Sequence, residues 1–70
     1  MADFKICMRL KRTGLPGYEV IEYRHLTQLP QVGAIIETAM NKKAIRARVV
    51  RVHGPDDIGE YTIYLDEVEN

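Results

Sequence analysis

The chain has 70 residues, a mass of 8.0 kDa and ten basic against ten acidic residues, so its formal net charge is zero. This length allows one small domain, residues 1–70, and the 46% hydrophobic content lets that domain fold around a core, which excludes a disordered chain. A single cysteine, Cys7, excludes an internal disulfide and a zinc site built from cysteines.

The first half of the chain predicts two strands, a turn between them and one helical turn. Residues 4–11 alternate apolar and polar side chains, as a half-buried strand does. Two glycines and a proline in residues 12–17 predict a turn, and the β-branched and aromatic side chains of residues 18–24 are typical of a second strand. Leucines and a valine then recur at every third position while Pro30 forbids a long helix, so we expect one helical turn near residues 25–30.

The second half predicts three more strands. Residues 34–40 and 44–53 are rich in β-branched and other apolar side chains and flank a short turn, which indicates a hairpin. Glycine, proline and aspartate in residues 54–59 end that hairpin, and residues 60–66 alternate again.

The pairing of the last two strands follows from matching inward residues with inward residues. Placing His53 opposite Glu60 brings Val50 opposite Ile63, with the apolar pairs inside. The adjacent residues Val49 and Val50 then break the alternation, and one extra residue at this point, a β-bulge, restores it. We therefore predict a bulge at this doublet.

These elements predict an all-β domain, a small five-stranded antiparallel barrel or strongly bent sheet with one short helical turn. The apolar doublets Val20-Ile21 and Ile35-Ile36 are either further bulges that bend the sheet or positions buried on both faces. The size is that of SH3-like and OB-like domains, and both strand orders remain open. Residues 67–70, in an acidic tail, are candidates for disorder. The predicted core consists of Phe4, Ile6, Met8, Leu10, Val20, Leu29, Val32, Ile36, Ile45, Ala47, Val50, Val52, Tyr61, Ile63 and Leu65.

The charges divide unevenly along the chain. Residues 1–54 hold all ten bases and four acids, whereas residues 55–70 hold six acids and no base. A basic face with aromatic residues is typical of nucleic-acid binding, which small five-stranded barrels often perform. The predicted nucleic-acid face combines outward bases of the first and fourth strands with one tyrosine for base stacking: Lys5, Arg9, Lys11, Arg46, Arg48, Arg51 and Tyr64.

Pairing across strands offers a purely structural explanation of the same charges. Opposite charges on neighbouring strands cancel the field that attracts phosphate. The predicted pairs are Arg46 with Asp66 and Glu37, Arg9 with Glu19, and a cation–π contact of Arg48 with Tyr64.

Apolar side chains on outward positions predict a protein interface. Four residues cannot all point inward while their strands keep the alternation, and an exposed apolar patch marks an interface: Cys7, Ile21, Tyr23 and Ile35. We therefore expect a non-enzymatic small binding domain, a protein-interaction module or subunit of a larger assembly that binds a protein partner or itself. Binding of nucleic acid through the basic face is the alternative.

The sequence predicts no enzyme, cofactor or metal site. Cys7 has positive neighbours but no assignable base, and His25 and His53 lack the spacing of metal ligands. No glycine-rich phosphate loop precedes a helix. We expect neither a small-molecule substrate nor membrane contact, and the lack of a signal segment or a long apolar run makes the cytoplasm the expected location.

Overall fold

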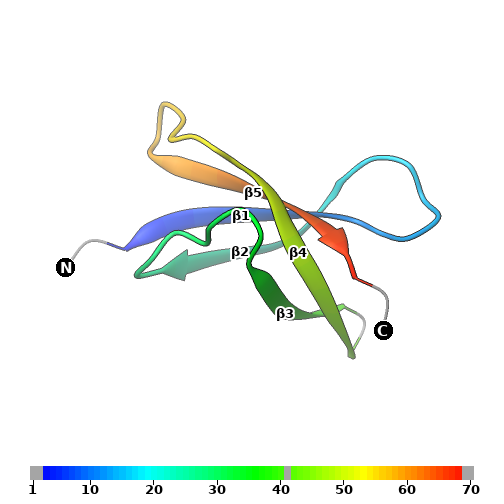
Figure 1. Ribbon diagram of the computed structural model, residues 1–70. Coiled ribbons are helices and arrows are strands. Elements are labelled where there is room, and N and C mark those ends of the chain that lie inside the picture. Colours follow the sequence, from blue (N-terminus) through cyan, green and yellow to red (C-terminus); the bar gives the residue numbers. More distant parts are fainter. Residues whose placement is uncertain (1–2, 41, 69–70) are drawn as a thin grey trace.

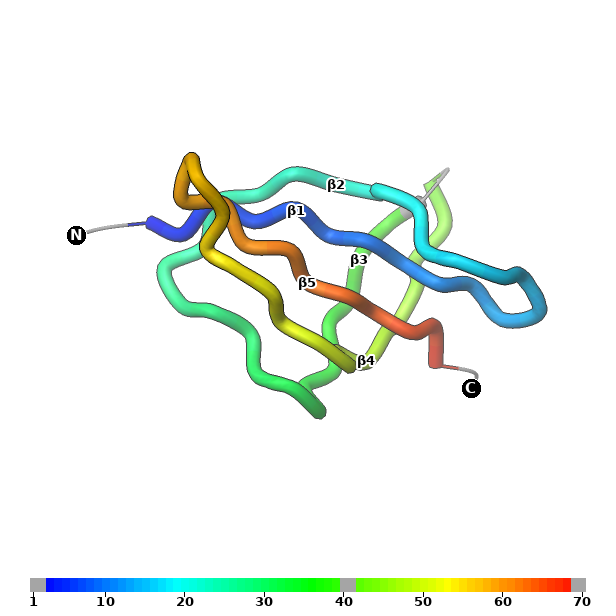
Figure 2. The backbone as a smooth tube through the Cα atoms, turned by 90° about the horizontal axis from the view of Figure 1, so that it is seen from above, coloured from blue at the N-terminus to red at the C-terminus, as the bar shows by residue number. Residues whose placement is uncertain are grey.

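The computed structural model describes residues 3–40 and 42–68 and consists of one curled sheet. Its strands are β1 (Phe4–Lys11), β2 (Glu19–Leu26), β3 (Ile35–Met40), β4 (Lys43–His53) and β5 (Glu60–Glu67). They lie in the order β2-β1-β5-β4-β3, so β2 and β3 are the edge strands. The sheet forms a half-barrel, and its two edges are not hydrogen-bonded to each other within the described residues (Figures 1 and 2).

One pair of strands is parallel. β1 pairs antiparallel with β2, and β3, β4 and β5 form an antiparallel meander, but β1 and β5 run side by side in the same direction (Figure 1). The prediction of a wholly antiparallel sheet is therefore wrong for this pair. Alternating side chains decide which face of a strand is buried, and they carry no information about the direction of its neighbour.

A loop rather than a helical turn connects the two antiparallel units. β2 continues to Leu26, which packs against the core, and the bend that follows places Leu29 there as well, without helical geometry. Gly33 N donates to Val49 O at 2.8 Å and Val49 N donates to Ala34 O at 2.9 Å, which fixes the end of the loop on β4. Residues 3–40 and 42–68 contain no helix that could cross a membrane.

The core fills the concave side of the half-barrel, as the alternation in the strands requires. Seven predicted core residues are buried: Ile6, Met8, Leu10, Ile45, Ala47, Ile63 and Leu65. Phe4, Leu29, Ile36 and Val52 are partly buried against them, and Tyr61 contacts Phe4 edge to face with ring centroids 5.6 Å apart. The assignment of Val20, Val32 and Val50 to the core is wrong, because these residues lie at bulges or in the loop, where the alternation stops.

The pairing of β4 with β5 confirms the predicted bulge and corrects its register. The register shifts between Val49 and Arg51, so Val50 is the extra residue and Val49 takes the buried position. Arg51 lies opposite Tyr64, two residues from its predicted partner. Because side chains alternate with a period of two, a displacement by two residues leaves the side chains of β4 and β5 on their predicted faces, apart from Val49 and Val50.

The loop before β5 explains this displacement. Asp56 Oδ1 accepts hydrogen bonds from Ile58 N at 3.0 Å and Glu60 N at 2.8 Å, and Asp56 N donates to Glu60 O at 2.9 Å. These bonds tie Glu60, the first residue of β5, to the loop residue Asp56, and the ladder with β4 begins two residues later, at Thr62. Gly54, at φ 129°, packs so closely here that a Cβ would lie 2.9 Å from Glu60 O.

β2 contains a second bulge. Its register with β1 skips Ile21, which lies between the paired residues Val20 and Glu22 and packs against the core. The doublet Ile35-Ile36 pairs with β4 without a shift and presents one residue to each face, so it forms no bulge. At the end of the chain, Val68 N donates to Arg46 O at 2.9 Å, and residues 69–70 lie outside the described part.

Candidate functional site

The outward side chains of the sheet form one convex face. Its members follow four cross-strand rows: His25, Lys5 and Glu60; Tyr23, Cys7, Thr62 and His53; Val20, Arg9, Tyr64 and Arg51; Lys11, Asp66, Arg48 and Ile35. Arg46 and Glu37 pair beside the fourth row. The structure thus brings all seven residues of the predicted nucleic-acid face together on this surface, because each occupies a position that alternates with a core residue.

The third row is the centre of the convex face. The Arg51 guanidinium carbon lies 5.7 Å from the ring centroid of Tyr64, a cation–π contact. Arg48 was predicted in this place, and the displaced register puts Arg51 there instead. Arg9 lies on the other side of Tyr64, and its Nε is buried without a partner. The ring of Tyr64 therefore helps to hold a cation on the sheet surface.

Tyr18 joins this centre from the loop between β1 and β2. Its hydroxyl donates to Asp66 Oδ1 at 2.8 Å, and its ring meets Tyr64 edge to face with centroids 5.2 Å apart. The hydrogen bond to Asp66, with a smaller effect of burial, raises the pKa of Tyr18. No sequence pattern indicates these contacts of Tyr18, because its partners lie on a strand at the far end of the chain.

Tyr23 and Cys7 are cross-strand neighbours in the second row. Cys7 points to the convex side as predicted but is only 3% exposed, since the cross-strand neighbours Tyr23 and Thr62 flank it. Tyr23 itself is 69% exposed. The neighbouring thiol, by its charge interaction and hydrogen bond, raises the pKa of Tyr23, and Glu60 adds to this while Arg9 opposes it. Tyr23 is thus a neutral, solvent-facing ring.

The four residues of the predicted protein interface do not form one surface. Cys7 is buried under Tyr23, and Ile21 packs against the core from the bulge in β2. Tyr23 lies on β2 and Ile35 on β3, at opposite edges of the sheet.

Cross-strand neutralisation of the cations on the convex face is only partial. Arg48, not Arg46, lies opposite Asp66, and Arg9 lies opposite Val20 instead of Glu19. Arg46 does pair in register with Glu37. Five of the cations form no ion pair with any residue of the described chain: Lys5, Arg9, Lys11, Arg48 and Arg51.

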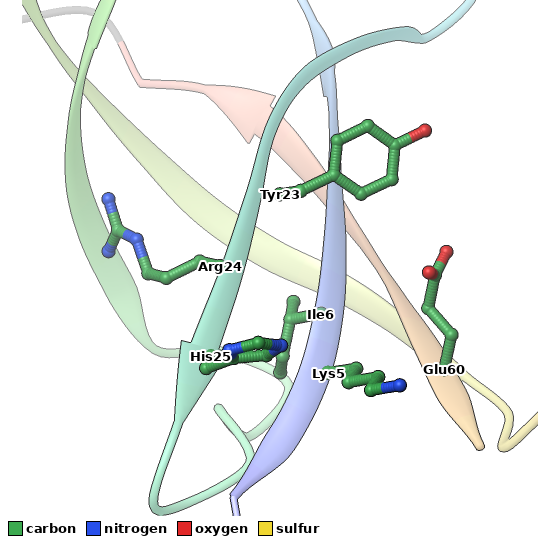
Figure 3. A pocket seen from close by; sticks show the side chains of 6 residues that line it. All are labelled: Lys5, Ile6, Tyr23, Arg24, His25 and Glu60. Atoms are coloured by element: carbon green, nitrogen blue, oxygen red, sulfur yellow. The ribbon is translucent and has the colours of Figure 1, made fainter.

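A shallow hollow of about 170 Å³ lies beside Tyr23 at the first row (Figure 3). Its lining consists of Lys5, Ile6, Tyr23, Arg24, His25 and Glu60. In Figure 3, the side chains of Tyr23 and Glu60 lie on the same side of the sheet across β1, whereas Arg24 points to the other side. Arg24 pairs there with Glu22 on the concave side. Sequence reasoning missed this hollow because it depends on the parallel pairing of β1 with β5.

Two smaller hollows, of about 140 Å³ each, lie at the loop between β1 and β2. No group of three or more His, Cys, Asp or Glu side chains gathers among the described residues.

No protein-family model matches the chain, and comparisons with curated proteins and with solved structures found no similar protein.

Proposed function

We propose that this domain binds single-stranded nucleic acid across the convex face of its sheet. The observation that carries the proposal is that five cations without ion-pair partners share this face with three tyrosines. Phosphate contacts from such cations supply most of the affinity for a nucleic-acid strand, and aromatic rings supply stacking for its bases. The tyrosines are Tyr18, Tyr23 and Tyr64.

Charge on the convex face supports this proposal although the whole chain is neutral. Its six Lys and Arg residues face three acids, Glu37, Glu60 and Asp66, so its formal charge is +3. The other described acids lie outside the strands or at concave positions of the sheet. A nucleic-acid strand on the convex face would therefore meet a positive surface.

In this proposal, Tyr64 and Tyr23 have different roles. Both Arg51 and Tyr18 contact the ring of Tyr64, so Tyr64 positions a cation and does not itself stack on a base. Tyr23 has the free ring, and a base reaches it only when unstacked, as in a single strand. A duplex groove, in contrast, is read by a helix or a two-stranded ribbon inserted into it.

The salt dependence of binding tests this proposal. Binding of a short fluorescein-labelled oligothymidylate is followed by anisotropy at several salt concentrations. Each of Lys5→Ala, Lys11→Ala and Arg48→Ala is expected to weaken binding and to reduce the slope of log K against log salt by about 0.7, because one phosphate contact is lost. Lys43→Ala is the matched control, since Lys43 lies opposite Met40 in register, on the side of β4 that faces the core. Unchanged slopes in all three variants would refute the assignment.

A second candidate function, binding of a protein partner or of a second copy, is favoured by the edge strand β3. β3 is hydrogen-bonded to β4 alone among the described strands. Ile35, the first residue of β3, is 40% exposed, and Val32, in the loop before it, is 65% exposed. An open edge with such residues accepts another strand. We place either function in the cytoplasm, where the single thiol stays reduced.

A variant of Ile35 tests this second candidate. Ile35→Asp puts a charge at the edge and is expected to abolish any concentration-dependent association seen by light scattering. The fold should be retained because Ile35 faces away from the core. A domain that stays monomeric at every concentration would refute self-association, and an unfolded variant would show that Ile35 contributes to the core.

A further inference from the structure

The hollow beside Tyr23 has the size and position of a subsite for one nucleobase. Its volume of about 170 Å³ is well below that of pockets for drug-sized ligands, roughly 300 Å³ and more. It opens on the convex face, and the exposed ring of Tyr23 forms one of its walls (Figure 3). A single unstacked base on that ring would lie next to the first row, which contains His25, Lys5 and Glu60.

The carboxylate of Glu60 is the acceptor of this hollow. It makes no hydrogen bond or ion pair with any of the described residues, although Lys5 is its register partner on β1. Figure 3 shows it on the same side of β1 as Tyr23. The backbone of Glu60 is fixed on both sides by Asp56, through the bonds at 2.8 and 2.9 Å. A fixed backbone with an unpartnered carboxylate leaves two acceptor oxygens for a ligand.

We propose that this hollow selects guanine, whose two adjacent N–H donors on the Watson–Crick edge would bind the Glu60 carboxylate while the ring stacks on Tyr23. The proposal rests on the single-strand binding proposed above. Adenine and cytosine present one amino donor beside a ring acceptor, so they make only one such bond. Thymine and uracil present one N–H between two carbonyl oxygens, which the carboxylate repels. Lys5 lies beside the hollow, where it would contact the phosphate of the same nucleotide.

The experiment compares oligothymidylates that differ in one central base. Fluorescein-labelled strands with guanine, adenine, cytosine or thymine at that position are titrated with the full chain at low salt. The guanine strand is expected to bind about five- to tenfold more tightly than the all-thymine strand, the lower end of the range for a bidentate contact because the hollow is open to solvent. Glu60→Gln should reduce this preference to within about twofold, since an amide offers one acceptor in place of two.

Glu37→Gln is the matched control. Glu37 lies on the same convex face and loses the same charge, but it is on β3, away from the hollow. This variant should bind all four strands slightly more tightly and keep the preference for guanine. Backbone amide NMR spectra of both variants are recorded to check that each variant is folded.

Each outcome decides the proposal. Loss of the preference in Glu60→Gln and its retention in Glu37→Gln support the guanine subsite. Equal affinities of the four strands for the unmodified chain, or a preference that survives in Glu60→Gln, overturn the subsite while single-strand binding stands. No binding of any strand at low salt overturns the subsite together with the proposed function.

Discussion

Val49 and Val50 are chemically identical neighbours in β4, yet Val49 is fully buried and Val50 is 38% exposed. The bulge causes the difference, because it inserts Val50 between two inward positions. Composition and propensity treat the two residues alike, so only the pairing with β5 distinguishes them.

This difference predicts unequal costs of substitution. Val49→Ala removes two buried methyl groups and should lower the free energy of unfolding by about 2 kcal/mol, from lost burial and the cavity that remains. Val50→Ala should cost less than about 1 kcal/mol, as is usual for an exposed strand position. Urea unfolding followed by circular dichroism measures both values in a chain that has no tryptophan. A larger cost at Val50 would mean that the bulge lies one residue away.

At the scale of the elements, alternation together with β-branched and aromatic composition predicted the five strands, and alternation assigned the faces of the first, fourth and fifth. Alternation puts the seven predicted residues of the basic face on the outward side of their strands, and the pairing of β1 and β4 with β5 brings them together. The parallel pairing of β1 with β5 could not be predicted, because the direction of the loop after β2 leaves no periodic signal. Two features that depend on this pairing were missed as well: the contact of Tyr18 with Asp66, and the hollow between Tyr23 and Glu60.

Turn chemistry explains the remaining error in the elements. The prediction placed His53 opposite Glu60, whereas the hydrogen bonds between Asp56 and Glu60 tie Glu60 to the loop and the ladder with β4 begins two residues later, at Thr62. The same delay puts Arg51 over Tyr64. The predicted register therefore named the wrong arginine, Arg48, as the contact of Tyr64. It still named the right residues for the convex face.

At the scale of the whole molecule, the half-barrel places the proposed site mainly on its best supported strands. β1 and β5 each have a ladder on both sides, and together with β4 they hold all seven residues of the predicted basic face. Tyr23 is the exception, since it lies on the edge strand β2. In the proposed function, a cationic surface on central strands beside a stacking ring on an edge strand would let a single strand dock first and order its base afterwards.

Amide hydrogen exchange tests this distribution of stability. The amides of β1 and β5 should exchange more slowly than those of β2 and β3, by roughly a factor of ten or more, because edge strands open locally while the central strands open only on global unfolding. Measured at two protein concentrations, the same data separate the two candidate functions. Concentration-independent exchange of β3 indicates an edge that stays open, and protection that grows with concentration indicates a second copy on that edge. Equal protection of all five strands at low concentration would contradict an open half-barrel, since it requires β2 and β3 to be paired within one molecule.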